Sequence, residues 1–167
     1  MAETYKDAIA LLKADHRKVE DLFSQFEGAK SPSKKESLAK QICTELKIHT
    51  AIEEEIFYPA CNGKVEKDDM DEAYVEHDGA KLLINDIEAS APDAEYYDAK
   101  VMVLSEEIKH HVKEEEARGE GMFAQAKKEG VDVDGLLDQM LARKKELMAQ
   151  AKTSGLPPAK TTTLVTA

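Results

Sequence analysis

The chain has 167 residues, enough for one domain with a core and a short tail, and its 34 acidic against 23 basic residues give a formal net charge of −11. A negative field of this size repels phosphate backbones and acidic membrane surfaces, so we expect neither nucleic acid nor a membrane as a partner. The apolar runs are too short to span a bilayer, and the first residues lack the basic stretch of a signal peptide. Cys43 and Cys61 form no clustered spacing, so we expect reduced thiols in a cytoplasmic protein, with a disulfide as the alternative.

Breaks around Pro32, Pro59 and Pro92 divide most of the chain into four segments that we expect to be helical. The high content of charged residues and the few β-branched runs favour helix over strand. The segments cover about residues 4–27, 33–58, 67–90 and 93–117. Each is long enough for roughly 36 Å of helix. Long helices with short connections predict an all-α fold, an antiparallel up-down-up-down four-helix bundle.

A fifth amphipathic segment, about residues 134–151, follows the four. Its apolar residues recur at helical spacing, and they are Leu136, Leu137, Met140, Leu141, Leu147 and Met148. We therefore expect an additional C-terminal helix packed on the outside of the bundle. The last stretch, TSGLPPAKTTTLVTA, has too few periodic apolar residues to pack and is typical of a mobile tail. The predicted organisation is a bundle over residues 1–130, a packed helix over 131–152 and a mobile tail over 153–167.

Four of the five histidines fall on the apolar seams of the expected bundle, one in each long segment. Two of these histidines are followed four residues later by a seam glutamate. The six residues are His16, His49, Glu53, His77, His111 and Glu115. Given a rise of 1.5 Å per residue, all six lie within about a turn or two of one level in an antiparallel bundle. Because bare carboxylates are unfavourable in a core without partners, six such side chains on one layer indicate a metal site.

The stretch IKHHVKEEEARGE, which starts at Ile108, holds two adjacent histidines, and neighbours on a helix point about 100° apart. Only one of them can therefore face inward. His111 continues the apolar seam of its segment, and Glu115 follows it by one turn. The alternative pair, His110 and Glu114, stays open because a local bulge would shift the phase of the helix.

Neutral imidazole and carboxylate suit first-row metals such as iron, manganese or zinc. Six such ligands exceed the four that a structural zinc ion takes. A pair of metal ions fits better, with each carboxylate bridging both ions and the histidines at the two ends. This number of ligands leaves open coordination positions for a dioxygen-derived ligand, hydroxide or water.

The order H…HxxxE…H…HxxxE across four helices resembles the haemerythrin family, and more closely its bacterial branch, the HHE cation-binding domain. The resemblance covers about residues 8–125 and rests on LLKADHRKVEDLF, HTAIEEEIFYP, VEHDGAKLLI and HHVKEEE. It implies a non-haem di-iron centre in a four-helix bundle, with two iron ions joined by an oxo or hydroxo bridge. By this resemblance the terminal ligands are His16, His49, His77 and His111, and the bridging carboxylates are Glu53 and Glu115.

Two departures from the family pattern bear on function. Haemerythrins proper have a further histidine one turn from the third-helix ligand, whereas the positions four residues from His77 are Ala73 and Lys81. This absence weakens the case for reversible oxygen carriage. In the fourth segment, the sequence ARGEG interrupts the helical pattern, so either about one extra helical turn or a break at Gly119 and Gly121 lies beside Glu115.

The sequence thus predicts a cytoplasmic di-iron protein that binds or senses oxygen, nitric oxide or peroxide, or that senses iron or redox state. A separate protein partner would carry any signal onward. No separate acid–base or substrate pocket is visible in the sequence, so a binding role is favoured over an enzymatic one such as peroxide turnover. Two other interpretations remain: a ferritin-like carboxylate di-iron oxidase, whose sites use ExxH pairs and more carboxylates, and a metal-free helical interaction module.

Overall fold

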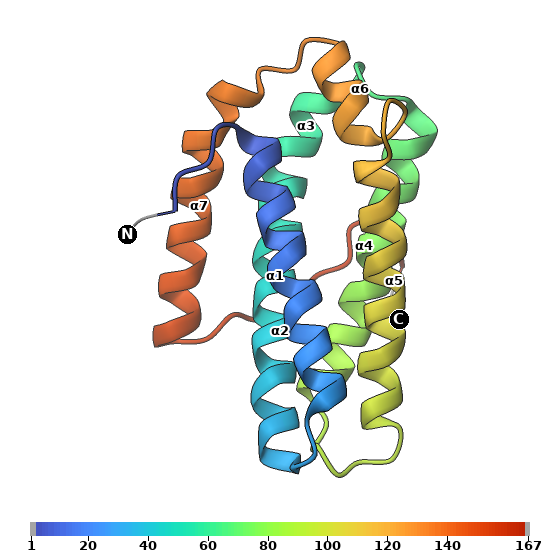
Figure 1. Ribbon diagram of the computed structural model, residues 1–167, viewed down its shortest axis with the longest axis vertical. Coiled ribbons are helices and arrows are strands. Elements are labelled where there is room, and N and C mark those ends of the chain that lie inside the picture. The colour runs from blue at the N-terminus through green and yellow to red at the C-terminus, as the bar shows by residue number, and fades with distance from the viewer. Residues whose placement is uncertain (1–2, 166–167) are drawn as a thin grey trace.

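The computed structural model describes residues 3–165, and their arrangement is a bundle of long helices with shorter helices at one end (Figure 1). The bundle helices are α1 (Ala8–Gly28), α2 (Pro32–Ile52), α4 (Lys67–Glu88) and α5 (Tyr97–Glu116). Each packs against the next in the chain, and α5 returns against α1, so the four close a ring in up-down-up-down order. The predicted all-α fold class is confirmed.

Local capping explains where α1 and α2 start. Asp7 accepts a hydrogen bond from the N–H of Ala10 at 2.7 Å, so α1 begins at Ala8, later than the periodicity predicts. Ser31 accepts from the N–H of Lys34 in the same way, and Pro32 occupies the first turn of α2. The first residues of α1 and α2 are therefore determined by side chains that lie next to them in the sequence.

The second predicted segment is not a single α-helix. After Ile52 the residues Glu53–Phe57 form a π-helical turn, η1, and α3 (Tyr58–Cys61) continues from it. The N–H of Tyr58 bonds the carbonyl of Glu53, five residues back. Residues five apart therefore share a face at this point, whereas a regular α-helix would turn the second one away. This change of phase was not expected from the sequence.

Two apolar clusters fill the bundle, one on each side of a polar layer. One contains Val19, Leu46, Ile84 and Leu104, and the other contains Leu12, Ile52, Phe57, Met70 and Phe123. Along α1, α2 and α4, one of the predicted histidines lies between residues of the two clusters, whereas all the core residues of α5 in these clusters belong to the first. The polar layer is therefore enclosed by apolar side chains above and below, which removes it from water.

Two further helices complete the fold. The short helix α6 (Met122–Lys128) covers one end of the bundle, and α7 (Val133–Thr153) lies along α1 and α2 (Figure 1). Met140 and Leu147 of α7 are buried, as the amphipathic pattern predicts. Arg143 pairs with Glu55 at 2.7 Å and fixes α7 beside η1.

Residues 155–164 form an irregular segment along α4, here called the C-terminal strap. Asp78 of α4 is fully buried and accepts hydrogen bonds from the N–H groups of Thr162 and Leu164, both at 2.8 Å. The sequence shows no apolar periodicity here, and hydrogen bonds to α4 take the place of apolar contacts. The domain boundaries and the mobility expected for this segment stay predictions.

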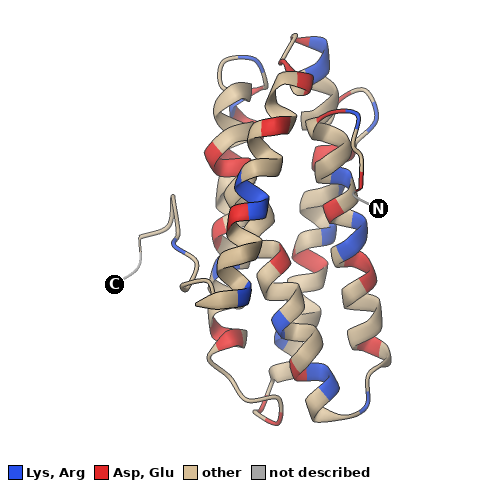
Figure 2. Ribbon diagram, turned by 90° about the vertical axis from the view of Figure 1, so that its left-hand side faces the viewer, with Lys and Arg blue, Asp and Glu red and all other residues tan. Residues whose placement is uncertain are grey.

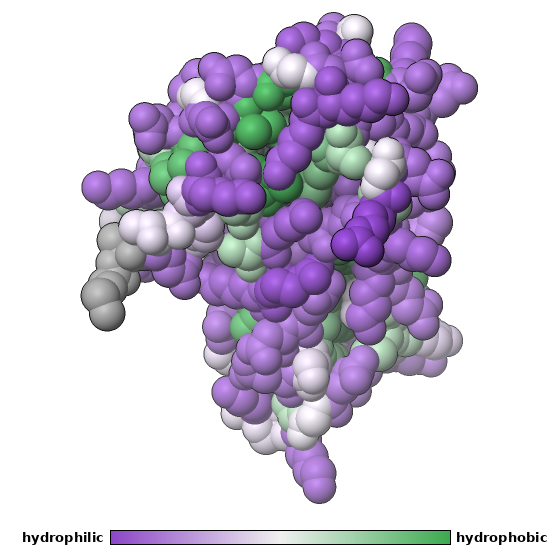
Figure 3. Space-filling model, turned by 45° about the horizontal axis from the view of Figure 1, so that its top comes forward, coloured by the Kyte–Doolittle hydropathy of each residue, from purple (hydrophilic) through white to green (hydrophobic). Residues whose placement is uncertain are grey.

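The surface carries both signs of charge. Acidic and basic residues alternate along the helices (Figure 2), and the face in Figure 3 is largely hydrophilic, with small apolar areas near the end covered by α6. Among the described residues, every helix is too short or too polar to cross a membrane.

Candidate metal centre

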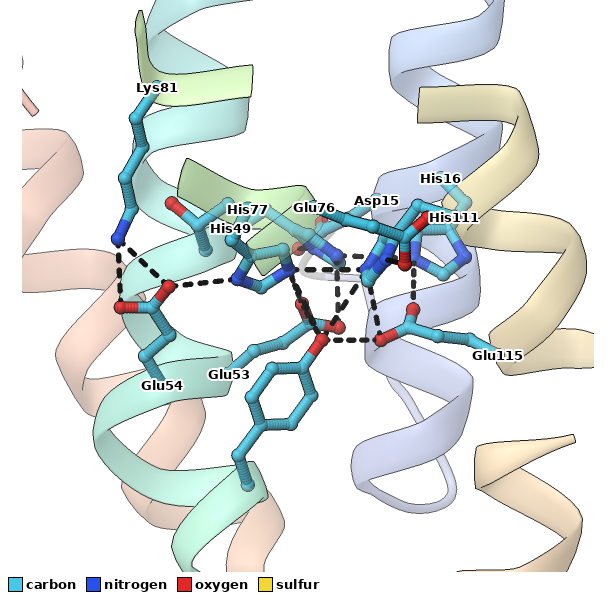
Figure 4. A network of polar contacts seen from close by, with 12 residues as sticks. Asp15, His16, His49, Glu53, Glu54, Glu76, His77, Lys81, His111 and Glu115 are labelled. Carbon is cyan, nitrogen blue, oxygen red and sulfur yellow. Dashed lines mark hydrogen bonds and ion pairs between the residues drawn. The ribbon is translucent and has the colours of Figure 1, made fainter. Parts of the chain in front are cut away.

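Six buried side chains converge in the middle of the bundle, and they are the six that the sequence predicts (Figure 4). Their exposed fractions run from 0% for Glu53 to 6% for His49. They are His16 from α1, His49 from α2, Glu53 from η1, His77 from α4, and His111 and Glu115 from α5. The structure thus joins all four bundle helices at one layer.

These side chains form two groups of donor atoms, each of which could hold a metal ion. In the first group, Nε2 of His16 lies 3.1 Å from Nε2 of His49. Glu53 Oε1 lies 3.1 Å from the same nitrogen of His49, and Glu115 Oε2 lies 3.3 Å from that of His16. Two imidazoles and two carboxylates therefore surround one small volume.

The second group uses the other oxygens of the same carboxylates. Nε2 of His77 lies 3.1 Å from Nε2 of His111. Glu53 Oε2 lies 3.0 Å from His77, and Glu115 Oε1 lies 3.2 Å from His111. Glu53 belongs to both groups, while Glu115 belongs to the first and reaches the second through the contact of its Oε1 with His111, so both carboxylates would be available to two cations.

A second ring of carboxylates orients the four imidazoles. Each histidine contacts one of these carboxylates through its Nδ1 atom. The pairs are His49 with Asp15 at 3.2 Å, His77 with Glu54 at 3.0 Å, His111 with Glu76 at 3.0 Å and His16 with Glu116 at 2.7 Å. Each of these outer carboxylates is the sequence neighbour of one central residue but serves a histidine on the next helix of the ring. The ring therefore closes from α1 to α2, α4, α5 and back to α1.

Three of the four outer carboxylates are neutralised by basic side chains. Lys144 pairs with Asp15, Lys81 with Glu54 at 2.8 Å, and Arg17 with Glu116 at 3.1 Å. Glu76 differs, because its ion-pair partners among residues 3–165 are His111 at 3.0 Å and His110 at 3.5 Å. The side of the centre between α4 and α5 is therefore the most negative.

The chemistry of the donor set fits a cation. A carboxylate accepts and does not donate, so each neutral imidazole carries its proton on Nδ1 and presents the Nε2 lone pair to the interior. With the imidazoles in this neutral form, Glu53 Oε1 and Glu115 Oε2 are buried without a hydrogen-bond donor in the described chain, although Nε2 of His49 and of His16 lie 3.1 and 3.3 Å from them. Such buried acceptors cost on the order of 1–3 kcal/mol each. A metal ion between the lone pairs would remove this cost and the repulsion among them.

Without a metal, protons take the place of the cation. Burial by itself lowers the pKa of His49, but Glu53 and Asp15 outweigh it and raise that pKa to about 10. Burial likewise raises the pKa of Glu115, but the nearby His111 and His16 outweigh it and hold that pKa well below the ordinary range. The centre therefore keeps its carboxylates ionised, ready to bind positive charge.

Comparison with known proteins identifies the fold and the family. A family model described as Hemerythrin HHE cation binding domain matches residues 7–123. The chain belongs to this family. It is also similar to a crystal structure of a Hemerythrin HHE cation binding domain-containing protein from Mycobacterium kansasii, with a TM-score of 0.72 and 18% identity, over 90% of this chain and 94% of that one. At that identity the likeness bears on the fold alone.

One curated relative is much longer than this haemerythrin-like chain. It is a protein of Nostoc sp. named DNA nickase, 31% identical over 107 residues. The match covers 64% of this chain but 30% of the relative. Because the match covers less than a third of the longer protein, it does not assign the activity of that protein to this chain.

The structure adds a residue to the centre that sequence reasoning did not place there. The hydroxyl of Tyr58 lies 2.7 Å from Glu115 Oε1, 3.1 Å from His77 Nε2 and 3.4 Å from His111 Nε2. It is fully buried and lies with the second group. The π-helical turn brings Tyr58 onto the face of Glu53, and this shift of phase has no signature in the apolar periodicity. In the sequence, Tyr58 is part of the motif HTAIEEEIFYP, to which the family resemblance assigns no role for the tyrosine.

The ARGEG interruption lies just outside the centre. α5 ends at Glu116, so Glu115 is still within regular helix. Gly119 has a positive φ of 79°, and a Cβ on Gly121 would lie 2.6 Å from the backbone nitrogen of Ala117. The two glycines therefore make a tight turn that the chain needs immediately after the last central residue.

The structure also separates the two adjacent histidines of this haemerythrin-like chain. His111 and Glu115 are 4% and 1% exposed. The side chains of His110 and Glu114 are 60% and 42% exposed and lie 3.0 Å apart on the surface. The interior position of His111 is the one that the phase of α5 predicts.

Proposed function

We propose that this chain is a cytoplasmic, non-haem di-iron protein that binds oxygen, nitric oxide or peroxide at its centre, or senses iron or redox state through it. One observation carries the proposal: two pairs of imidazole Nε2 atoms are joined by the same two carboxylates. Two donor groups that share bridging ligands suit two ions better than one. The ligand roles follow for His16, His49, Glu53, His77, His111 and Glu115.

Iron at such a site supplies redox chemistry and open coordination positions for small ligands. The residues of the chain supply the surroundings. The outer carboxylates hold each imidazole in one tautomer and orientation, and the two apolar clusters exclude water from the layer.

Tyr58 gives the two groups different properties. Burial and the nearby Glu115 and Glu53 raise the pKa of its phenol well above the usual value, so the hydroxyl keeps its proton. That proton points toward Glu115 Oε1 and lies among the donors of the second group. Tyr58 can therefore offer a hydrogen bond to a small ligand there, while the first group has apolar neighbours such as Phe123, whose ring stacks on His16.

The geometry disfavours the two rival functions. A ferritin-like oxidase uses more carboxylates at the metals, whereas here the four outer carboxylates contact the Nδ1 atoms instead. A metal-free interaction module gives no reason for two ionised carboxylates in the core, which are costly to bury and which the metal-free protein must balance with protonated imidazoles such as His49.

We do not extend the DNA nickase activity of the longer relative to this chain. The net charge of −11 opposes the approach of a phosphate backbone. The shared region is 30% of that protein, so its remaining length has no counterpart in this match. The proposal for this chain is therefore limited to the metal centre, a small ligand and a separate protein partner.

Metal analysis after aerobic purification from iron-replete cells tests the proposal. We expect about two irons per chain, as six ligands with two bridges require. The reduced protein should also change its absorption spectrum on titration with oxygen and with nitric oxide. A stoichiometry near one, a preference for zinc, or a spectrum unchanged by both gases would overturn the proposal.

A further inference from the structure

A cavity of about 390 Å³ opens between α4, α5 and the ARGEG turn. Its lining reaches His111 and Glu115, two of the buried central residues. Ala117, Gly121 and Met122 form the side next to the turn. The turn that interrupts the helical pattern therefore leaves a hollow directly over the second donor group.

The lining of this cavity is strongly acidic. Besides Glu115 it contains Asp69, Glu72, Glu76, Glu114 and Glu120. Neither lysine nor arginine belongs to the lining that the structure describes. This is also the side on which Glu76 lacks the basic partner that each other outer carboxylate has. The negative potential is therefore greatest where the centre comes nearest to this opening.

Exposed acidic residues alone would be an ordinary solvated surface, but two further observations point to a ligand. His111 and Glu115 are only 4% and 1% exposed, yet both line the cavity, so its floor is made of buried donor side chains of the centre. On the surface, donor atoms of Glu72 and Glu114, which line the cavity, and of His110, which lies outside its lining, are within 4.8 Å of one another. A cation can thus be held at the rim and again at the floor.

A second cavity, of about 600 Å³, provides a comparison. It reaches Tyr58 from another side, but its lining includes Lys64 and Lys67 together with acidic residues, and none of the central histidines belongs to it. Its mixed charge gives a cation no comparable attraction.

We propose that the acidic cavity between α4 and α5 is the route by which a divalent cation such as Fe²⁺ reaches the centre, with Glu72, His110 and Glu114 as an outer holding site. This inference rests on the proposed metal-binding function. A cleft lined with one sign of charge concentrates the opposite ion and speeds its association by about 10- to 1,000-fold. The carboxylates act on the rate of metal uptake, while the six central ligands determine how much metal is held.

The test is the rate of metal uptake by the metal-free protein, followed by stopped-flow absorption with Fe²⁺ under anaerobic conditions and with Co²⁺. The variant is Glu72→Gln/Glu114→Gln/Glu120→Gln, and all three side chains are exposed. The matched control is Glu27→Gln/Asp93→Asn/Glu95→Gln, which removes the same charge from exposed positions at the other end of the bundle. At low ionic strength the variant should load about tenfold more slowly than the control. The difference should shrink at about 1 M salt, where screening acts within about 3 Å.

Equal uptake rates for the variant and the control at low ionic strength would overturn the inference. A slower rate that is the same at all salt concentrations would overturn it too, because steering by charge must weaken with salt. The outcome is distinct from failure of the proposed function. If the native protein takes up no metal, the centre itself is wrong; if it loads normally and the variant matches it, only the route is wrong.

Discussion

The hydroxyl of Tyr58 donates a hydrogen bond to Oε1 of Glu115 at 2.7 Å, across the bundle from α3 to α5. This contact depends on the π-helical turn, which places Tyr58 five residues after Glu53 on the same face. It gives Oε1 of Glu115 a hydroxyl donor, and the same hydroxyl lies 3.3 Å from Oε2 of Glu53. Four predictions follow from the contacts of this layer and of the C-terminal strap.

Tyr58→Phe should keep the iron but change the absorption spectrum and weaken the retention of nitric oxide. The substitution preserves the aromatic ring, so the packing around the metal ligands is kept. It removes the hydroxyl, which is the hydrogen-bond donor to Glu115 Oε1. The metal-free variant should also be less stable by about 1–3 kcal/mol, since Glu115 Oε1 then lacks this donor. Iron content, spectra and urea unfolding of the metal-free protein measure these effects. An unchanged spectrum together with unchanged stability would contradict the role of the hydroxyl.

His111→Ala should abolish or cripple the metal centre, whereas His110→Ala should leave iron content nearly intact. His111 faces the second donor group, and His110 is an exposed surface residue. The same argument makes Glu115→Ala severe and Glu114→Ala mild. The iron content of the four purified variants decides the matter. Loss of iron in His110→Ala and Glu114→Ala, with the other two variants loaded, would mean that α5 is rotated by about 100° in solution.

The metal-free centre should release protons when it binds metal. The pKa of His49 is raised from 6.5 to about 10 by Glu53 and Asp15, against the effect of burial. Its protonation therefore stabilises the metal-free bundle fully below pH ~6.5, and this contribution is lost as the pH rises toward about 10. Because the metal needs the neutral imidazole, uptake at pH 7 releases protons and weakens as the pH falls.

Calorimetry in two buffers with different ionisation enthalpies measures this proton release. Thermal unfolding of the metal-free protein between pH 6.5 and 10 gives the second readout. Metal binding without proton release would contradict the prediction. So would a melting temperature that rises steadily over this pH range.

Asp78→Asn should loosen the C-terminal strap without removing the metal. The buried carboxylate accepts hydrogen bonds from the N–H groups of Thr162, Thr163 and Leu164, and an amide offers one fewer acceptor oxygen. Hydrogen exchange of residues 159–164 should speed up, and the stability should fall by about 1–3 kcal/mol. Asp86→Asn, on an exposed face of α4, is the matched control. Exchange rates equal to those of the control would show that Asp78 does not hold the strap.

The sequence alone was enough to predict the four bundle helices and α7, the antiparallel bundle and the inward face of the six central residues, but not the short helices α3 and α6. These features depend on local periodicity, since the 3.6-residue repeat of an α-helix sets which side chains share a face. The same periodicity distinguishes His111 from His110, because only His111 continues the apolar seam. It failed at Glu53–Phe57, where the π-helical turn changes the phase and brings Tyr58 into the centre.

Only the tertiary structure decided which carboxylate serves which histidine. Asp15 is next to His16 in sequence but contacts His49, and Glu76 is next to His77 but contacts His111. A residue one position from a central ligand points about 100° away from it, toward a neighbouring helix. Which helix lies there, and whether a lysine or an open cavity lies behind the carboxylate, depends on how the four helices pack. These contacts join residues that are distant in sequence. The closed ring of outer carboxylates and the acidic cavity beside Glu76 could therefore not be predicted from local sequence patterns.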